Sequence, residues 1–434
     1  ITLNQVEARG QVRLEQPALL VEGDSLKLNL NDYSGELTQP VYQLPANHSR
    51  GNASRIDFID ENRFKLQDAS YTTCPVDNDD WFLKVDNLDI DKTRNVGTAR
   101  NVSLEFLGVP ILYAPWLDFA LNNERKTGVL APTFGTTERS GLDFLVPYYF
   151  NLAPNYDATL YPRLLSKRGV QLGGEFRYLL DAARGENRLE YLPDDREADR
   201  SRWGAALNNE YRLNANTLAG MQYTRVSDDD YFRDLSNLIS ITSLTHLNQE
   251  AWVTTRHANW YAELRAQSFQ TLQDSTAPTP IVEPYERLPQ ARLGMTHTFG
   301  NGLEFKLESE ATRFAHPTLT EGTRVLAYPT LRLPMLNTFG FLTPQLGWHS
   351  TYYALDDNAP DERITRNLPI FSVDSGVVFD RPFSFAGRDY EQTLIPRAYY
   401  VYAPYRDQNA IPVFDTAMLD FSYAQMFTEN QFIG

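Results

Sequence analysis

The chain has 434 residues and a net charge of −16; 42% of its residues are hydrophobic and 22% are charged. This composition excludes a disordered chain, and the negative charge argues against a nucleic-acid partner. The length fits a smaller domain followed by a large barrel better than one ordinary domain. Because the most apolar run, 106–121, is broken by Pro110, Pro115 and Asp118, we expect no transmembrane helix. If the chain enters a membrane, a closed barrel is the remaining solution.

The first hundred residues show alternating apolar and polar side chains in units about 30 residues apart, a period typical of stacked β-repeats. Such alternation gives strands one apolar face and one wet face. That face is either the core of a β-sandwich or a groove for a lipid chain, and the alternation alone leaves both open. The candidate groove residues are Leu26, Leu28, Leu30, Ile56, Phe58, Phe64, Leu66, Leu104 and Phe106.

From about Gly128 onward, longer alternating segments follow one another, as in the run 170–180. We expect roughly sixteen strands here, more than a simple sandwich uses. Long polar loops at 227–248, 272–287 and 356–367 alternate with short turns, which is typical of an outer-membrane barrel. A water-soluble sandwich with its charges outside would show similar alternation, so the pattern does not cleanly separate the two. The 24 Tyr and 24 Phe residues suit the aromatic girdles of a barrel.

Two prolines, Pro132 and Pro147, lie inside successive segments that otherwise resemble strands. Proline cannot donate to a β-ladder and is normally confined to edges, strand starts and bulges. The pair therefore predicts a seam with weakened pairing, which is useful in a gate. The alternative is that the prolines end pairing to suit a domain junction.

We find no pattern that predicts catalysis, so we expect no enzyme activity, no cofactor and no metal. The six histidines are scattered, without the spacing of metal ligands. The run 126–128 reads Lys-Thr-Gly but no SxxK nucleophile accompanies it. The run Asp228-Asp229-Asp230 lacks the spaced ligands of a calcium loop, and we interpret it as a solvated acidic loop.

Several runs carry a family resemblance: "NVSLEFLGVPILYAPWLDFALNNERKTGVLAPTFG" from 101, "GLDFLVPYYFNLAPNYDATLYPRLLSKRG" from 141, "LQDASYTTC" from 66, "SDDDYFRDL" from 227 and "LDFSYAQMFTENQFIG" at the end. With these, essentially the whole chain resembles the LptD (OstA or Imp) family of lipopolysaccharide-assembly proteins. The resemblance implies an all-β fold: a periplasmic β-jelly-roll at 1–105, a hinge or linker at 106–127, and the N-terminal part of a large antiparallel outer-membrane β-barrel at 128–434.

The resemblance also implies a function in the Gram-negative outer membrane, with the N-terminal domain in the periplasm. The jelly-roll would receive lipopolysaccharide from the bridge protein LptA at its N-terminal edge, and the barrel would enclose the lipoprotein plug LptE. Lipopolysaccharide would leave between barrel strands into the outer leaflet. In this comparison Pro132 and Pro147 match the family's gate prolines. Cys74 matches a cysteine that forms an inter-domain disulfide, and its partner is absent from this sequence.

The chain begins at Ile1, already inside a strand-like pattern, so we interpret it as a fragment lacking the N-terminal edge and the rest of the barrel. Sixteen strands in lipid would leave two unpaired edges, so we expect the fragment alone not to insert as a closed barrel. Two other functions stay open: a general porin, which needs neither jelly-roll nor gate prolines, and an outer-membrane lipase, for which no Ser–His pair is evident.

Overall fold

The computed structural model describes residues 4–16, 19–44, 48–76, 78–121, 125–236, 243–274, 277–356 and 362–433. Parts of the expected linker (122–124) and of the three long loops (237–242, 275–276 and 357–361) lie outside these ranges. The chain divides into two compact units, 1–132 with 146–159 and 133–145 with 160–434. The predicted all-β fold is confirmed, because antiparallel strands make up most of both units.

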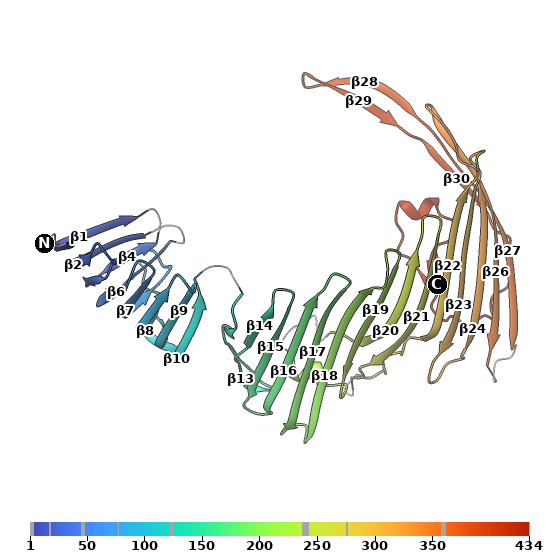
Figure 1. Ribbon diagram of the computed structural model, residues 1–434. Coiled ribbons are helices and arrows are strands. Elements are labelled where there is room, and N and C mark those ends of the chain that lie inside the picture. The colour runs from blue at the N-terminus through green and yellow to red at the C-terminus, as the bar shows by residue number, and fades with distance from the viewer. Residues whose placement is uncertain are drawn as a thin grey trace. The chain divides into compact units, whose positions relative to one another are not determined.

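The first unit is built on one ten-stranded antiparallel sheet (Figure 1). Its strands run in the order β10-β9-β8-β7-β6-β3-β2-β4-β5, and β1 pairs with β2. Their bounds are β1 (Gln5–Gln16), β2 (Leu19–Asn29), β3 (Gly35–Thr38), β4 (Val41–Leu44), β5 (Ser49–Asn52), β6 (Arg55–Phe58), β7 (Arg63–Tyr71), β8 (Trp81–Asp91), β9 (Val96–Phe106) and β10 (Val109–Ala120). The short strands β11 (Gly128–Val129) and β14 (Tyr148–Ala153) pair with each other in the same unit.

The antiparallel register of the first sheet collects its apolar side chains into rows across the strands. One row crosses seven strands: Leu26, Leu37, Ile56, Leu66, Leu88, Ala99 and Leu117. The next row toward one end of the strands contains Leu28, Gly35, Phe58, Phe64, Ile90, Gly97 and Phe119. Because side chains alternate between faces, the 30-residue units stack their apolar positions on one face.

The segment 106–127, expected as a linker, contains strand β10, which pairs with β9 over nearly its whole length. Pro110 and Pro115 disfavour a central strand, but β10 is the edge of its sheet, where a missing N–H costs little. The first sheet therefore extends to Ala120, beyond the boundary at residue 105 that the sequence predicts.

The second unit contains a long antiparallel sheet in which neighbouring strands follow one another along the chain (Figure 1). Eighteen strands in the described ranges form this sheet, including β11 and β14 of the first unit. The other sixteen are β12 (Thr133–Thr137), β13 (Gly141–Leu145), β15 (Tyr156–Leu165), β16 (Gly169–Leu179), β17 (Ala183–Asp195), β18 (Arg200–Arg212), β19 (Thr217–Val226), β20 (His246–Arg256), β21 (Trp260–Thr271), β22 (Glu286–Thr298), β23 (Glu304–Ala315), β24 (Gly322–Arg332), β25 (Met335–Asn337), β26 (Gly340–Leu355), β27 (Arg363–Val377) and β30 (Arg397–Tyr402).

Smaller elements accompany this sheet. They are helix α1 (Tyr231–Leu235), the hairpin of β28 (Phe379–Phe385) and β29 (Arg388–Leu394), β31 (Ala417–Met418), the 3-10 helix η2 (Ala424–Phe427) and β32 (Phe432–Ile433). Within the described ranges, no helix combines the length and apolarity needed to cross a membrane.

The long sheet has two chemically different faces. One row of paired residues contains Val253, Leu264, Ala291, Ala311, Val325 and Tyr352. Leu264 on this face is 55% exposed, although its side chain is apolar. The neighbouring row on the opposite face contains Arg265, Gln290, Thr312, Arg324 and Tyr353, and the last four are buried. The exposed apolar face and the covered polar face agree with the wall of a barrel in lipid.

Candidate functional site

The apolar face of the first sheet is the candidate groove, and one end of it is closed. Strand β5 folds next to the end of β7, where Arg50 and Thr72 exchange two backbone hydrogen bonds of 2.9 Å. The Tyr42 hydroxyl in β4 also donates to the Ser70 carbonyl. These contacts cover a core that includes Leu37, Ala69 and Val85. The chain's own strands and side chains therefore fill this end of the apolar face.

The nine predicted groove residues divide by burial. Ile56 and Leu66 belong to the buried core, and Leu26, Phe58 and Phe64 pack against it while partly exposed. Leu28 and Leu104 are half-buried, whereas Leu30 (48% exposed) and Phe106 (49%) lie at strand ends. The accessible part of the candidate groove is therefore the row of Leu28, Phe58 and Phe64, whereas Ile56 and Leu66 lie in the neighbouring, more buried row of the same face.

Sequence reasoning missed three further residues of the row of Phe64, namely Ile90, Gly97 and Phe119. The Phe119 ring lies over Gly97 so closely that a Cβ added there would be 2.4 Å from it. A side chain at 97 would therefore displace the Phe119 ring from this position. Because Gly97 has no apolar side chain, the alternation of apolar and polar residues could not identify it as part of this row.

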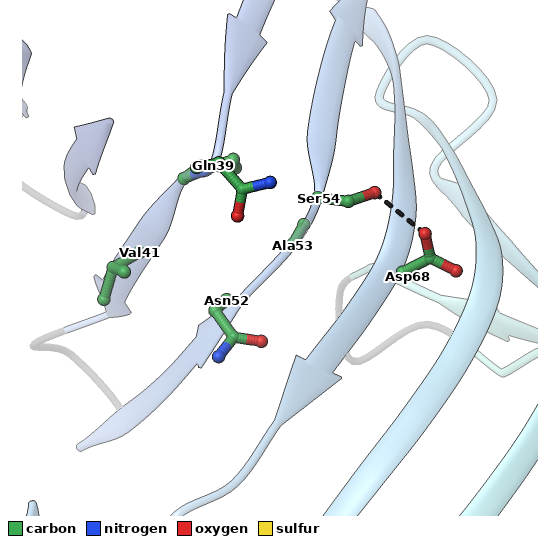
Figure 2. A pocket seen from close by; sticks show the side chains of 7 residues that line it. Gln39, Val41, Asn52, Ala53, Ser54 and Asp68 are labelled. Carbon is green, nitrogen blue, oxygen red and sulfur yellow. Dashed lines mark hydrogen bonds between the residues drawn. The ribbon is translucent and has the colours of Figure 1, made fainter. Parts of the chain in front are cut away.

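A separate hollow of about 320 Å³ on the first unit is lined by Gln39, Asn52, Ser54 and Asp68 among other residues. Ser54 donates a hydrogen bond of 2.9 Å to Asp68 at one side of it (Figure 2). None of the nine predicted groove residues lines this hollow. Its polar walls do not suit an acyl chain, so we do not assign it to the groove.

The two candidate gate prolines lie where strand pairing breaks. Pro132 directly precedes β12, and the buried Pro147 separates β13 from β14. Val129 pairs with Tyr148 and Thr133 pairs with Leu145, so the register shifts by one residue between these pairs. Leu130 donates its N–H to the Pro147 carbonyl at 2.9 Å, and proline has no N–H to return the bond. The division into compact units also falls between 132 and 133 and between 145 and 146.

Beyond the prolines, the first strands of the second unit are held by polar contacts that sequence reasoning did not identify. Arg163 of β15 donates twice to Asp143 of β13, at 2.8 and 2.6 Å. It also donates to the Leu235 carbonyl at the end of α1, at 2.8 Å. The motif at 227–235 that carries the family resemblance is therefore the segment that covers these strands. A cavity of about 710 Å³ remains beneath it, with Asp143, Arg163, Glu190 and Tyr231 among its walls.

A buried ion network fixes this segment to the wall. Arg202 of β18 is fully buried and contacts Asp195 at 3.1 Å, Asp228 at 2.6 Å and Asp234 at 2.9 Å. Burial alone would raise the pKa of the Asp228 carboxyl, but hydrogen bonds from Arg202 and Ser227 outweigh burial and lower the pKa. The interpretation of 228–230 as a solvated loop is thus wrong for Asp228, because Arg202 approaches it through strand pairing and not through sequence proximity.

A second segment, 411–429, covers the polar face of β22 to β27. Asp415 accepts hydrogen bonds from Arg324 at 2.7 Å and from Arg287 at 3.4 Å. The ring of Phe414 stacks on Phe314 with centroids 4.4 Å apart. Farther along, Glu429 accepts hydrogen bonds from Tyr328, Gln345 and Ser372. The chain's own segments therefore occupy much of the face that an open water channel would leave free.

Cys74, the one cysteine of the sequence, is a free thiol and half-buried. Its carbonyl accepts a hydrogen bond of 3.1 Å from Arg50, which also donates to Pro75, Asn78 and Asp79. One guanidinium thus fixes the loop that presents the thiol. Among the residues that the structure describes, no cluster of three or more His, Cys, Asp or Glu could hold a metal ion.

Comparison with known proteins agrees with these features. The family model described as "LptD: LPS transport system D" matches residues 200–434. The chain is 74% identical over 99% of its length to the LPS-assembly protein LptD of Thiobacillus denitrificans, covering 59% of that protein. It is 45% identical to the LptD of Nitrosospira multiformis and 44% identical to that of Nitrosomonas eutropha, covering 47% and 60% of them. The chain thus spans about half to three-fifths of its curated relatives, and it belongs to the LptD family.

Proposed function

We propose that the protein to which this chain belongs transports lipopolysaccharide and inserts it into the outer leaflet of the Gram-negative outer membrane. The first unit would act in the periplasm as the jelly-roll that carries acyl chains, and the second would be the N-terminal part of the barrel wall. Membership of the LptD family supports this assignment, since its relatives are named LPS-assembly proteins. Transport of this kind needs no catalytic residue in the chain.

The observation that carries the lateral-gate role is the broken pairing at Pro132 and Pro147. One ladder bond is absent beside Leu130, and the register changes within the same few residues. A general porin has no use for such a break. The segments that cover the polar face also disfavour an open diffusion channel, so the porin alternative is not favoured.

The partners extend this proposal. LptA would deliver lipopolysaccharide at the jelly-roll edge by strand addition, and the lipoprotein LptE would fill the barrel. Acyl chains would lie along Leu28, Phe58 and Phe64, the half-buried part of the apolar face. Cys74 would form its disulfide with a cysteine outside this sequence, and the loop held by Arg50 supports a fixed position for that thiol.

The gate is tested by replacing Pro132 and Pro147 with alanine in the full-length protein. The substitution at 147 supplies the N–H that can return the bond to Leu130, a net gain of about 0.5–1.5 kcal/mol. We expect slower arrival of pulse-labelled lipopolysaccharide at the cell surface, with normal heat-modifiable folding of the barrel. The matched control is Pro329→Ala, because Pro329 lies inside wall strand β24. Unchanged export in the double variant, or equal slowing in the control, would remove the gate role.

A further inference from the structure

The hairpin of β28 and β29 has one apolar and basic face and one acidic face. The strands pair antiparallel around the turn at Ala386 and Gly387, whose φ angles are +52° and +74°. The pairing places these residues on one face: Phe379, Leu394, Arg381, Gln392, Phe383, Tyr390, Phe385 and Arg388. The other face carries Asp380, Thr393, Pro382, Glu391, Ser384 and Asp389. Two side-chain hydrogen bonds support this division into faces. Arg381 donates to Gln392 at 2.7 Å on the first face, and Ser384 donates to Asp389 at 2.6 Å on the second.

The apolar face of this hairpin is exposed. Phe385 is 66% exposed, Leu394 65% and Phe379 56%. An isolated two-stranded hairpin with such a face is marginal in water. Because large exposed apolar patches mark interaction sites, the face needs an occupant.

The occupant follows from continuity with the wall. Figure 1 shows the hairpin as a ribbon that runs on from β27 and β30. Only Val378 separates β27 from β28. The N–H of Val377 donates to the Pro396 carbonyl on one side, and the N–H of Val378 donates to the Phe339 carbonyl on the other. Backbone groups alternate in this way along one continuous strand. Phe371 and Val377 of β27 therefore share a face with Phe379. That is the exposed apolar face of the wall, opposite Ser372 and Asp374.

Length places the hairpin outside the hydrocarbon core. A tilted barrel strand crosses the core with about 9–11 residues, and β27 alone has 15. The turn at 386–387 belongs to the short-turn end of the sheet, which in outer-membrane barrels is periplasmic. The hairpin then leaves the wall at the inner leaflet, where Arg381 and Arg388 on the aromatic face match anionic headgroups.

We propose that the apolar and basic face of the β28–β29 hairpin lies on the periplasmic surface of the outer membrane and binds anionic phospholipid headgroups. Its rings enter the interface while Asp380, Asp389 and Glu391 face water. This inference rests on the proposed position of the second unit as a barrel wall.

A photocrosslinker tests this directly. We would incorporate p-benzoylphenylalanine in place of Phe383 in the full-length protein, reconstituted with its plug in vesicles of phosphatidylethanolamine with phosphatidylglycerol, and identify adducts by mass. The matched control has the same probe in place of Glu391 on the acidic face. We expect phospholipid adducts at 383 and few at 391. Replacing either Arg381 or Arg388 with glutamine should lower the yield of phospholipid adducts at 383 about fivefold. In phosphatidylcholine vesicles, which lack anionic headgroups, the same substitutions should leave the yield unchanged.

Protein adducts at 383 would overturn the proposal in favour of a protein occupant. Equal yields at both positions, or no adducts at either, would also overturn it, because the face would then have no preference for lipid. A crosslinker in place of Phe58 reports separately on lipopolysaccharide transport in cells. Lipopolysaccharide adducts at 58 without phospholipid adducts at 383 would refute only the proposal for the hairpin. Phospholipid adducts at 383 without lipopolysaccharide adducts at 58 would refute only the proposed transport function.

Discussion

The two sheets use the same alternation of apolar and polar residues with opposite results. In the first unit the apolar row is covered: Leu37 is 2% exposed and Leu66 is 6% exposed. In the second unit the apolar row is exposed and the polar face is covered, with Arg202 fully buried. Apolar packing therefore stabilises the inner face of one sheet, and ion networks stabilise that of the other. The difference shows that alternation defines two faces but not which of them meets solvent.

Among the substitutions that test this comparison, we expect the largest loss of stability at the Arg202 network of the second unit. Replacing Arg202 with alanine removes the one cation that contacts Asp195, Asp228 and Asp234 together, although Arg168 still contacts Asp195 and Asp234. Loss of one member of a buried network costs about 3–5 kcal/mol. We expect the segment 227–236 to lose its protection against amide hydrogen exchange in the full-length protein. Arg200→Ala is the matched control, since Arg200 also contacts Asp228 but is half exposed. Equal effects of the two variants would show that burial of the network does not matter.

In the first unit the corresponding change is Leu66→Ala. Removing this buried side chain should lower the free energy of unfolding by about 2–5 kcal/mol, through lost burial and the cavity left behind. Hydrogen exchange of β7 and β8 in the intact chain would measure the loss. The control Leu30→Ala changes a half-exposed residue of the same predicted groove, with an effect of about 0.5 kcal/mol or less. A large effect at Leu30 would mean that something covers it.

The smallest expected effect is a pH dependence confined to the first unit. Burial raises the pKa of the Tyr42 hydroxyl to about 12. The folded state thus holds the proton more tightly than the unfolded state, and the resulting stability is present below the ordinary pKa of about 10 and lost as pH rises toward 12, by about 2 kcal/mol. Thermal unfolding of the first unit against pH would show this decline. In Tyr42→Phe the decline should be absent, and its persistence would assign it to another group.

Much of the fold could be predicted from the sequence, because strand alternation is local. The rows through Ile56 and Leu66, and the series of long wall strands, follow from it directly. The contacts of Asp228 could not be predicted, since Arg202 lies on a strand 26 residues away and meets it only through the register. The extent of β10 was missed for a related reason: Pro110 is tolerated only because the strand is at an edge, and edge position is a property of the whole sheet.

The unreturned bond between Leu130 and Pro147 also has a kinetic consequence. Separating two strands requires breaking their ladder bonds in turn, and here one is absent before the process starts. If each bond contributes about 0.5–1.5 kcal/mol, its absence speeds strand separation by a factor of about 2 to 13. In the proposed gate, the stretch between Val129 and Thr133 would be the place where opening begins at low cost, while the pairs on either side hold the strands close enough to close again.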